Sequence, residues 1–429
     1  MANITVKGIS GPLSGEVLPP GDKSISHRAI MLGSLTGGRC VATGFLRSED
    51  TFSTMNAFKS MGVDINLGAD FLEINGVGVH GLKEPSGIID AGNSGTTARL
   101  IMGLLSGQEF NSELTGDKYL RKRPMKRVVD PLRLMGAEIG GKNGADNLPL
   151  RIKGKKLNSI RYELPVASAQ VKSSIILAGL FADGETEIIE PQKTRDHTER
   201  MLDHLGSPLR TEGNSIFVRP VEHLAPSELN IPADISSAAF FIVAALINRG
   251  SEISLKNIGL NSARTGIIDI LKRMGASIEI MNMRTECGED VGDILVKSSD
   301  LHGIEIKGDD IPGAIDELPV IAAAACFADG TTVISDAEEL RVKETDRIKA
   351  VVTEFSKLGA NITEHEDGME IHGQQQLRGN TCDSWGDHRI AMSVAVAASA
   401  ASGDTVINNH ECVNISYPEF FDTLDSLRT

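Results

Sequence analysis

Aromatic side chains are scarce in this sequence of 429 residues, at 4% of the composition, so the hydrophobic core must be built mainly from aliphatic residues. Five cysteines are present, but they lie far apart and without a Cys-x-x-Cys spacing. This distribution argues against a disulfide framework or a cysteine-based zinc site. The longest apolar runs, such as VIAAAACFA, fall well short of the roughly 18 residues that a membrane span needs, so no membrane role is expected.

Positive charge is in deficit, with 43 Lys and Arg against 58 Asp and Glu and a formal net charge of −15. Such an acidic chain is a poor nonspecific ligand for nucleic acid, which needs a basic face to replace the counterions on its phosphates. The N-terminal stretch MANITVKGISGP contains no basic segment followed by an apolar one, so no secretion or transit signal is indicated. We therefore expect a cytoplasmic protein without a nucleic-acid partner.

The length predicts more than one domain, and a search for internal repeats indicates how they are organised. A polar start leads into an alanine-rich or aliphatic helix pattern, then into a β-branched strand and a second amphipathic helix. The six polar starts are DKSISHRAI at Asp22, NSGTTARLI at Asn93, SAQVKSSII at Ser168, DISSAAFFI at Asp234, DELPVIAAA at Asp316 and DHRIAMSVA at Asp387.

The second helix of each repeat is predicted to end at a glycine that serves as a left-handed C-cap. The five glycines are Gly62, Gly136, Gly206, Gly275 and Gly359, spaced 69 to 84 residues apart. One repeat is too small to bury its own apolar face, so we expect three repeats to share a core. Two lobes result, divided near the proline-bearing passages: residues 21–229, and residues 1–20 together with 230–429.

The stretch PPGDKSISHRAIML places cations at a helix start. Asp22 is predicted to cap the helix, and Lys23 and Arg28 lie in its first turns. Cations at a helix N-terminus oppose the helix dipole at a cost of roughly 0.3–1 kcal/mol each, so an anionic ligand is expected to compensate. A capped surface helix is the alternative that this motif alone leaves open.

Other basic residues recur at equivalent places near the polar starts or the turns that precede helices. They are Arg99, Arg123, Lys172, Arg195, Arg341, Lys343, Arg347 and Arg389. A lone basic residue is normally a solvated surface charge, but this recurrence in an acidic protein favours one pocket between the lobes for ligands with several phosphates or carboxylates. Pro124, next to Arg123, is predicted to be the first residue of a helix.

Two acidic residues stand among these cations, Asp316 in IDELP and Glu344 in RVKETDRI. A carboxylate beside several cations stays ionised and can accept a proton. The alternatives are a helix N-cap for Asp316 and an ion pair on a helix face for Glu344. The sequence contains no Gly-x-x-x-x-Gly-Lys-[Ser/Thr] motif and no His-Glu-x-x-His motif, so neither a P-loop kinase nor a zinc enzyme of that type is indicated.

Nine phrases, in order and across almost the whole chain, resemble the family of 3-phosphoshikimate 1-carboxyvinyltransferases, the EPSP synthases. They are PGDKSISHRAIML, GNSGTTARL, RPM, SAQVKS, TRDHTERML, DISSAAFF, IDELPV, RVKETDRI and GDHRIAM. The resemblance implies an α/β fold of two lobes, each with three βαβαββ repeats around a pseudo-threefold axis. It also implies transfer of the enolpyruvyl group of phosphoenolpyruvate to the 5-hydroxyl of shikimate 3-phosphate, in chorismate and aromatic amino acid biosynthesis. No metal or organic cofactor is implied, and we expect a monomer.

The resemblance also implies roles for individual residues. Contacts to shikimate 3-phosphate are implied for Lys23, Ser24, Arg28, Ser168, Ala169, Gln170, Arg195, Asp316 and Lys343. Contacts to phosphoenolpyruvate are implied for Lys23, Gly95, Arg123, Gln170, Arg347 and Arg389, with Asn93, Thr96 and Arg99 supporting that pocket. The catalytic residues would be Asp316 near the 5-hydroxyl, Glu344 near C3 of phosphoenolpyruvate, and Lys23 beside the departing phosphate.

The C-terminal segment NISYPEFF departs from some members of the family, which carry a lysine there, so a contact from Ile415 to phosphoenolpyruvate is left open. SAQVKS, TRDHTER and Glu339 are similar to the second class of the family, often less sensitive to the inhibitor glyphosate. Gly95 is the position where, in the family, alanine crowds that inhibitor, so sensitivity is left open. Two rival hypotheses are the UDP-N-acetylglucosamine enolpyruvyl transferase, whose loop cysteine is absent between Cys40 and Cys287, and a ring-forming DNA clamp.

Overall fold

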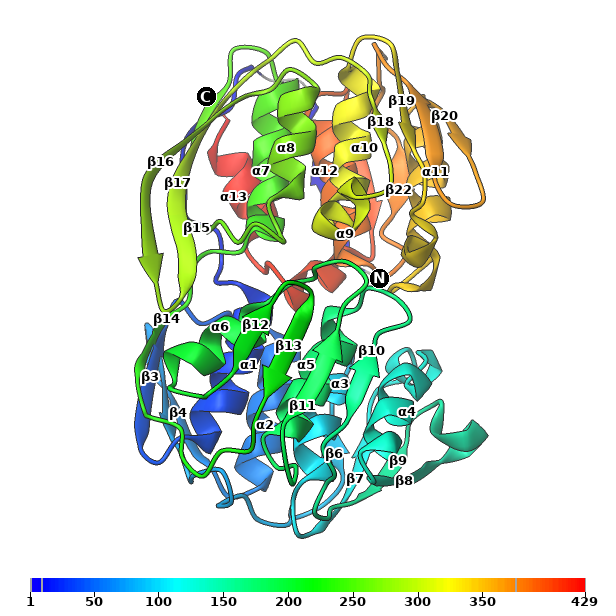
Figure 1. Cartoon of the computed structure of the whole chain (residues 1–429). Helices are drawn as coiled ribbons and strands as arrows, with labels where there is room; N and C mark the ends of the chain where they lie inside the picture. Colours follow the sequence, from blue (N-terminus) through cyan, green and yellow to red (C-terminus); the bar gives the residue numbers. More distant parts are fainter. Residues whose placement is uncertain (1, 9–10, 375, 429) are drawn as a thin grey trace. The chain divides into compact units, whose positions relative to one another are not determined.

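The computed structural model describes residues 2–8, 11–374 and 376–428 (Figure 1). The chain folds into two compact parts. The first lobe comprises Gly21–Ile231 and Thr285–Glu289, and the second lobe comprises Met1–Pro20, Pro232–Arg284 and Asp290–Thr429. The short segment Thr285–Glu289 belongs to the first lobe, although the residues on both sides of it belong to the second. No sequence pattern predicted this assignment.

The first lobe alternates strands and helices. Its elements are α1 (Lys23–Leu35), β3 (Arg39–Thr43), α2 (Glu49–Ser60), β4 (Asp64–Leu67), β5 (Phe71–Asn75), β6 (Ile89–Asp90), α3 (Gly95–Ser106), β7 (Asn111–Thr115), η1 (Leu120–Lys122), α4 (Lys126–Leu134), β8 (Glu138–Gly141), η2 (Lys142–Ala145), β9 (Leu150–Lys153), β10 (Arg161–Glu163), α5 (Ala169–Gly179), β11 (Thr186–Ile189), α6 (His197–His204), β12 (Arg210–Glu212), β13 (Ser215–Val218) and β14 (Glu228–Asn230).

The second lobe repeats this alternation. Its elements are β1 (Asn3–Val6), β2 (Ser14–Val17), α7 (Ile235–Ile247), β15 (Glu252–Gly259), α8 (Gly266–Arg273), β16 (Ser277–Glu286), β17 (Glu289–Lys297), β18 (Glu305–Ile306), α9 (Asp310–Ala314), α10 (Leu318–Phe327), β19 (Thr331–Ile334), η3 (Glu338–Val342), α11 (Arg347–Lys357), β20 (Asn361–Glu364), β21 (Met369–His372), β22 (Thr381–Asp383), α12 (His388–Ser399), β23 (Thr405–Asn408), η4 (His410–Ile415) and α13 (Phe420–Ser426). In the part of the chain that the structure describes, no helix is both long enough and apolar enough for a membrane span.

The sheets share one plan. The strand orders are β14-β3-β5-β4, β6-β7-β9-β8 and β10-β11-β13-β12 in the first lobe, and β16-β17-β15-β2, β18-β19-β21-β20 and β1-β23-β22 in the second. In each sheet one edge strand pairs in parallel with the strand that follows the inner helix, as β6 does with β7 and β18 with β19. Antiparallel pairings occur in every sheet, for example between β7 and β9. This plan confirms the predicted fold of repeated βαβαββ units.

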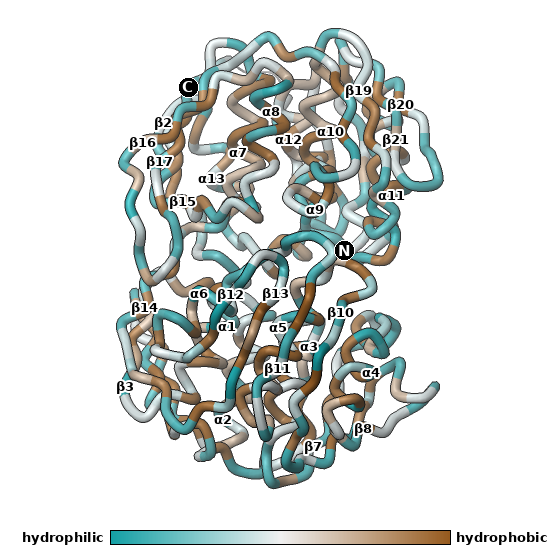
Figure 2. The backbone as a smooth tube through the Cα atoms, in the orientation of Figure 1, coloured by the Kyte–Doolittle hydropathy of each residue, from teal (hydrophilic) through white to brown (hydrophobic). Residues whose placement is uncertain are grey.

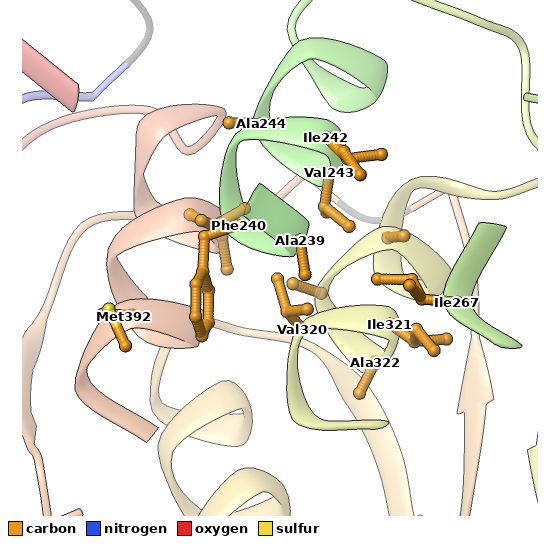
Figure 3. Packing of buried hydrophobic residues seen from close by; sticks show 14 of the residues in the cluster. Ala239, Phe240, Ile242, Val243, Ala244, Ile267, Val320, Ile321, Ala322 and Met392 are labelled. Carbon is orange, nitrogen blue, oxygen red and sulfur yellow. The ribbon is translucent and has the colours of Figure 1, made fainter. Parts of the chain in front are cut away.

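The first helix of each repeat forms the interior of its lobe. In the second lobe the apolar and alanine-rich helices α7, α10 and α12 pack on one another. Figure 3 shows Phe240 of α7 beside Met392 of α12, and Ala239 of α7 near Val320 of α10. Hydrophobic stretches along α7 and α10 are brown in Figure 2, and small alanine side chains let such helices approach closely. The core is therefore aliphatic, as the composition predicts.

The helix ends largely follow the sequence signals. All five repeat glycines adopt a positive φ, between 81° and 97°, which is the left-handed conformation predicted for a C-cap. Asp22 caps α1 by accepting a hydrogen bond from the Ile25 amide, as predicted. One prediction was wrong, because Pro124 lies before α4 instead of opening it. The alternative of an N-cap role for Asp316 is excluded for α10, whose N-cap is Glu317; the Asp316 carboxylate is engaged by arginines.

The helices α3 and α5 approach each other closely at Gly103. A Cβ atom on this residue would lie 2.1 Å from the backbone oxygen of Ser174, a distance that no real side chain tolerates. The absence of a side chain therefore lets the two helices pack backbone to backbone. This contact also sets the distance between the N-termini of α3 and α5, which carry several of the predicted site residues.

We predict that Gly103→Ala lowers the stability of the protein by about 1–3 kcal/mol, because the added methyl group must push α5 away from α3. Urea unfolding and thermal denaturation measure the change. Gly140→Ala is the matched control, since a Cβ atom there meets nothing within 4 Å. Equal stability of the two variants would show that α3 and α5 do not depend on this close approach.

Candidate active site

In the first lobe, most predicted contact residues lie at the N-terminal ends of α1, α3, α5 and α6. Lys23, Ser24 and Arg28 lie on α1, and Ser168 caps α5 by accepting a hydrogen bond from the Val171 amide. Arg195 precedes α6. Since helix N-termini present free amides and the positive end of a dipole, this part of the lobe is suited to bind anions.

Arg28 is 5% exposed and is held by three helices. Its Nε donates to Thr198 Oγ1 at 2.7 Å, its Nη2 to Ser173 Oγ at 2.9 Å, and its Nη1 to the Ser24 carbonyl at 2.9 Å. Burial lowers the pKa of Arg28 to about 10; Glu199 opposes this shift and the nearby Arg195 adds to it. A buried guanidinium group that a neighbouring guanidinium repels favours a bound anion.

Lys23 and His27 are the other basic residues of α1. Lys23 Nζ lies 3.4 Å from Asp50 Oδ2, and its side chain is 21% exposed. His27 Nδ1 lies 2.7 Å from Thr54 Oγ1 in the interior. Burial, together with the charges of Lys23 and Arg28, holds the pKa of His27 well below its usual range. The imidazole is therefore neutral at neutral pH and adds no further positive charge to this site.

A second group of predicted residues meets around Gln170. Arg99 Nη1 donates to Gln170 Oε1 at 2.7 Å, and Gln170 Nε2 lies 3.4 Å from Thr96 Oγ1. Arg123 Nη2 donates to Asn93 Oδ1 at 2.8 Å. The guanidinium groups of Arg99 and Arg123 flank Gly95. A Cβ atom on Gly95 would lie 3.0 Å from Arg99 Nη1 and 3.2 Å from Arg123 Nη1. Gly95 thus leaves the two arginines room to lie against the helix start.

In the second lobe, Arg347 joins the two acidic residues that the sequence singled out. Its Nη1 lies 3.1 Å from Asp316 Oδ1, its Nη2 2.5 Å from Glu344 Oε2, and its Nε 2.8 Å from Asp387 Oδ2. Arg347 is 1% exposed. Burial alone would lower its pKa, but the three carboxylates outweigh burial and raise it. The arginine therefore remains charged and fixes Asp316 and Glu344 in one place.

Arg389 approaches Asp316 from the start of α12. Its Nη1 donates to the Asp316 carbonyl at 3.0 Å and lies 3.3 Å from Glu317 Oε1, while its Nη2 is 3.8 Å from Asp316 Oδ2. Glu317 is 1% exposed and also accepts a hydrogen bond from Ser236. Sequence reasoning missed Glu317, although its position next to Asp316 in a buried, cation-rich helix start was a usable signal.

Lys172 does not lie where the sequence suggested. The side chain is fully buried, whereas the recurrence of cations had placed it among the pocket residues. Its Nζ lies 3.0 Å from Glu190 Oε1 and 2.7 Å from Glu199 Oε1. The prediction of a pocket cation is therefore wrong for this residue, because two buried carboxylates take up its charge within the lobe.

Arg341 and Lys343 are engaged locally as well. Arg341 Nη1 pairs with Asp346 at 2.8 Å and with Glu364 at 2.9 Å, so its charge is largely neutralised. Lys343 Nζ lies 3.2 Å from Glu339 Oε1 and remains 21% exposed. Of these two cations, Lys343 is the one that can exchange a single carboxylate for a ligand.

A hollow of about 960 Å³ lies on the first lobe. It is lined by residues 84–88 and parts of β7, β8 and β9, and it contains none of the predicted site residues. Its charged side chains are of both signs and pair with one another, as Lys153 does with Glu138. Within the described residues no group of His, Cys, Asp and Glu side chains is placed to hold a metal ion.

Comparison with known proteins agrees with the fold. The sequence model of the family described as EPSP synthase (3-phosphoshikimate 1-carboxyvinyltransferase) matches residues 7–424. The 3-phosphoshikimate 1-carboxyvinyltransferase of Geotalea uraniireducens is 53% identical over 100% of this chain and 99% of its own length, and that of Geotalea daltonii is 54% identical over 95% of each. A solved structure of EPSP synthase from Acinetobacter baumannii has a TM-score of 0.90 at 44% identity and covers 99% of this chain and 98% of its own.

The repeated βαβαββ units with polar, cation-bearing helix starts define an α/β enolpyruvyl transferase. Within that class, the chain belongs to the EPSP synthase family. The family's activity is that of a 3-phosphoshikimate 1-carboxyvinyltransferase, EC 2.5.1.19, a transferase of the shikimate pathway in aromatic amino acid biosynthesis.

Burial raises the pKa of Glu199 above its usual range, although the Lys172 ammonium opposes the shift. A raised carboxyl pKa means that the ionised form lowers the stability of the fold, a cost that is complete above the raised pKa and vanishes as the pH falls to the ordinary glutamate value of about 4.3. We therefore predict that Glu199→Gln is more stable than the wild type at neutral pH and that its advantage disappears in acid. Urea unfolding across this pH range measures the difference.

Glu185→Gln is the control, and its stability at neutral pH should change in the opposite direction. Hydrogen bonding from Arg219 lowers the pKa of this half-buried carboxyl, so neutralisation removes a weak stabilising contribution at neutral pH. If Glu199→Gln were less stable than the wild type at neutral pH, the attraction of Lys172 would outweigh the burial of Glu199.

Proposed function

We propose that this chain transfers the enolpyruvyl group of phosphoenolpyruvate to the 5-hydroxyl of shikimate 3-phosphate and releases phosphate. The observation that supports this reaction best is the set of cations at the helix starts of the first lobe, among which Arg28 and Arg99 are buried and already oriented by hydrogen bonds. We assign shikimate 3-phosphate binding mainly to the first lobe, residues 21–229. The acid and base groups and further phosphoenolpyruvate contacts are assigned to the second, residues 1–20 and 230–429.

The phosphate of shikimate 3-phosphate is assigned to the helix starts around Arg28 and Arg195. Arg28 is oriented by Thr198 and Ser173, so its guanidinium loses little freedom on binding an anion. The repulsion between the two arginines is relieved when a phosphate lies between them. The proposed contact set is Lys23, Ser24, Arg28, Ser168, Ala169, Gln170, Arg195, Asp316 and Lys343.

Phosphoenolpyruvate carries a phosphate and a carboxylate, and arginine binds both groups in bidentate geometry. The proposed contacts are Lys23, Gly95, Arg123, Gln170, Arg347 and Arg389, supported by Asn93, Thr96 and Arg99. The hydrogen bonds from Arg99 to Gln170 and from Arg123 to Asn93 support this assignment, because they orient the donors before the ligand binds. Gly95 supports it by leaving both guanidinium groups against the helix start.

The chemistry requires two proton transfers at C3 of phosphoenolpyruvate and one at the 5-hydroxyl. Asp316 accepts the hydroxyl proton while the oxygen attacks C2. Glu344 reacts in its acid form, giving C3 a proton and taking one back as phosphate leaves. Lys23 protonates or steadies the departing phosphate. Positioned groups of this kind typically contribute about 10²–10⁴-fold each. The shared contact of Asp316 and Glu344 with Arg347 supports their assignment as a pair.

Three finer assignments complete the proposal. The motifs SAQVKS and TRDHTER, together with Glu339, favour the second class of the family. Because Gly95 carries no side chain, these motifs do not decide glyphosate sensitivity, which an inhibition assay measures. We propose a monomeric, cytoplasmic enzyme. Gel filtration with light scattering tests the first property and cell fractionation the second.

The reaction itself is tested by following phosphate release from phosphoenolpyruvate with either shikimate 3-phosphate or UDP-N-acetylglucosamine as the acceptor. We predict turnover with shikimate 3-phosphate alone. Turnover only with the UDP-sugar would overturn the proposed substrate. Salt-dependent retention of DNA without turnover of either acceptor would favour the clamp hypothesis instead.

We predict that Glu344→Gln lowers kcat by about 10²-fold or more, because glutamine cannot transfer a proton at C3. Binding of shikimate 3-phosphate should change little, since the amide oxygen can still accept the hydrogen bond of Arg347. Steady-state rates and calorimetry measure the two quantities. Glu364→Gln, which alters an exposed partner of Arg341, is the control and should keep near-normal turnover. Near-normal kcat in Glu344→Gln would remove this residue from the mechanism.

A further inference from the structure

Lys172 is an unusual residue in the first turn of α5. It is a fully buried cation, and it lies close to the helix N-terminus, where the dipole disfavours positive charge. We propose that Lys172 is a positioning residue that fixes the segment carrying Arg195 and thereby sets the affinity for shikimate 3-phosphate without touching the substrate. This inference rests on the role proposed above for Arg195.

The Lys172 ammonium joins three parts of the first lobe. From α5 it reaches Glu190, just after β11, at 3.0 Å to Oε1 and 3.1 Å to Oε2. It also reaches Glu199 Oε1, in the first turn of α6, at 2.7 Å. A further contact, at 3.3 Å, goes to the carbonyl oxygen of Thr194. An ammonium has three protons to donate, so these acceptors within the lobe occupy it completely and leave none for a ligand.

Thr194, which precedes Arg195 in the chain, is held at each of its polar groups. Its amide donates to Glu190 Oε1 at 3.2 Å, its hydroxyl donates to the same carboxylate, and its carbonyl accepts from Lys172. On the other side of Arg195, Asp196 accepts hydrogen bonds from Arg200, at 2.9 Å to the carboxylate and 3.0 Å to the carbonyl. The backbone of Arg195 is therefore fixed from both directions.

The same group of charges also acts on Arg28. The Lys172 ammonium and the carboxylates of Glu190 and Glu199 together carry a net negative charge. Of these groups, Glu199 favours the charged form of Arg28. The buried Arg28 can then stay charged before substrate arrives. Lys172 thus serves the phosphate site in two ways, by fixing the Arg195 segment and by holding Glu199 close to Arg28.

A mutant cycle with Arg195 distinguishes positioning from a merely structural role. We expect Lys172→Met to raise the KM for shikimate 3-phosphate about tenfold or more, with smaller changes in kcat and in the KM for phosphoenolpyruvate. In an Arg195→Ala background the same substitution should have a much smaller effect, because the main group that it positions is absent and only its action on Arg28 through Glu199 remains. Lys172→Arg should restore part of the affinity, since a guanidinium can still donate to both glutamates.

Two further variants complete the experiment. Lys153→Met is the matched control, since it removes an exposed, ion-paired lysine of the same lobe and should leave both KM values unchanged. Thr194→Val keeps every charge and removes only the hydroxyl that binds Glu190. It should raise the KM for shikimate 3-phosphate severalfold, and it tests the proposal even if Lys172→Met does not fold.

The outcomes are distinguishable. Three results would each overturn the positioning role. The first is that the effects of Lys172→Met and Arg195→Ala multiply in the double variant. The others are equal increases in both KM values, or an unchanged KM for shikimate 3-phosphate in Thr194→Val and Lys172→Met. An unchanged KM for shikimate 3-phosphate in Arg195→Ala alone would instead contradict the assignment of Arg195 to the substrate site.

Discussion

The need to compensate buried charge at helix starts governs this structure. Arg28, Lys172 and Arg347 are almost inaccessible to solvent, and a buried cation is tolerated only when nearby acceptors replace its water. Each therefore sits in a network that joins several helices. In the first lobe the network surrounds the proposed phosphate site, and in the second it gathers Asp316 and Glu344 on one guanidinium. The site and the core of each lobe are held by the same interactions.

Close helix packing makes these networks possible. Alanine-rich inner helices and a glycine at the crossing of α3 with α5 bring helix starts near enough for side chains to bridge them, as Gln170 does with Arg99 and Thr96. A larger side chain at Gly103 or in the α7, α10 and α12 interior would separate those starts. The small residues of the core thus contribute to the chemistry by fixing distances rather than by touching a substrate.

Local signals in the sequence predicted the local structure well. The N-cap at Asp22 and the left-handed glycines at the helix exits depend on a few neighbouring residues, and the sixfold repeat follows from them. Partners far apart in the sequence could not be predicted in this way. Lys172 looked like one more pocket cation because nothing local shows that Glu190 and Glu199 fold against it, and Glu317 went unnoticed for the same reason. The roles of individual side chains rest on the family resemblance and on the proposals made above.

We propose that the anionic groups of the substrates compensate the positive charges at these helix starts. A crystal structure of the protein with shikimate 3-phosphate and phosphoenolpyruvate is the decisive test of this claim. The claim predicts that the guanidinium groups of Arg28 and Arg195 both contact the phosphate of shikimate 3-phosphate, with Arg123 and Arg389 on phosphoenolpyruvate. Substrates bound away from these helix starts, or a phosphate held by neither Arg28 nor Arg195, would contradict it.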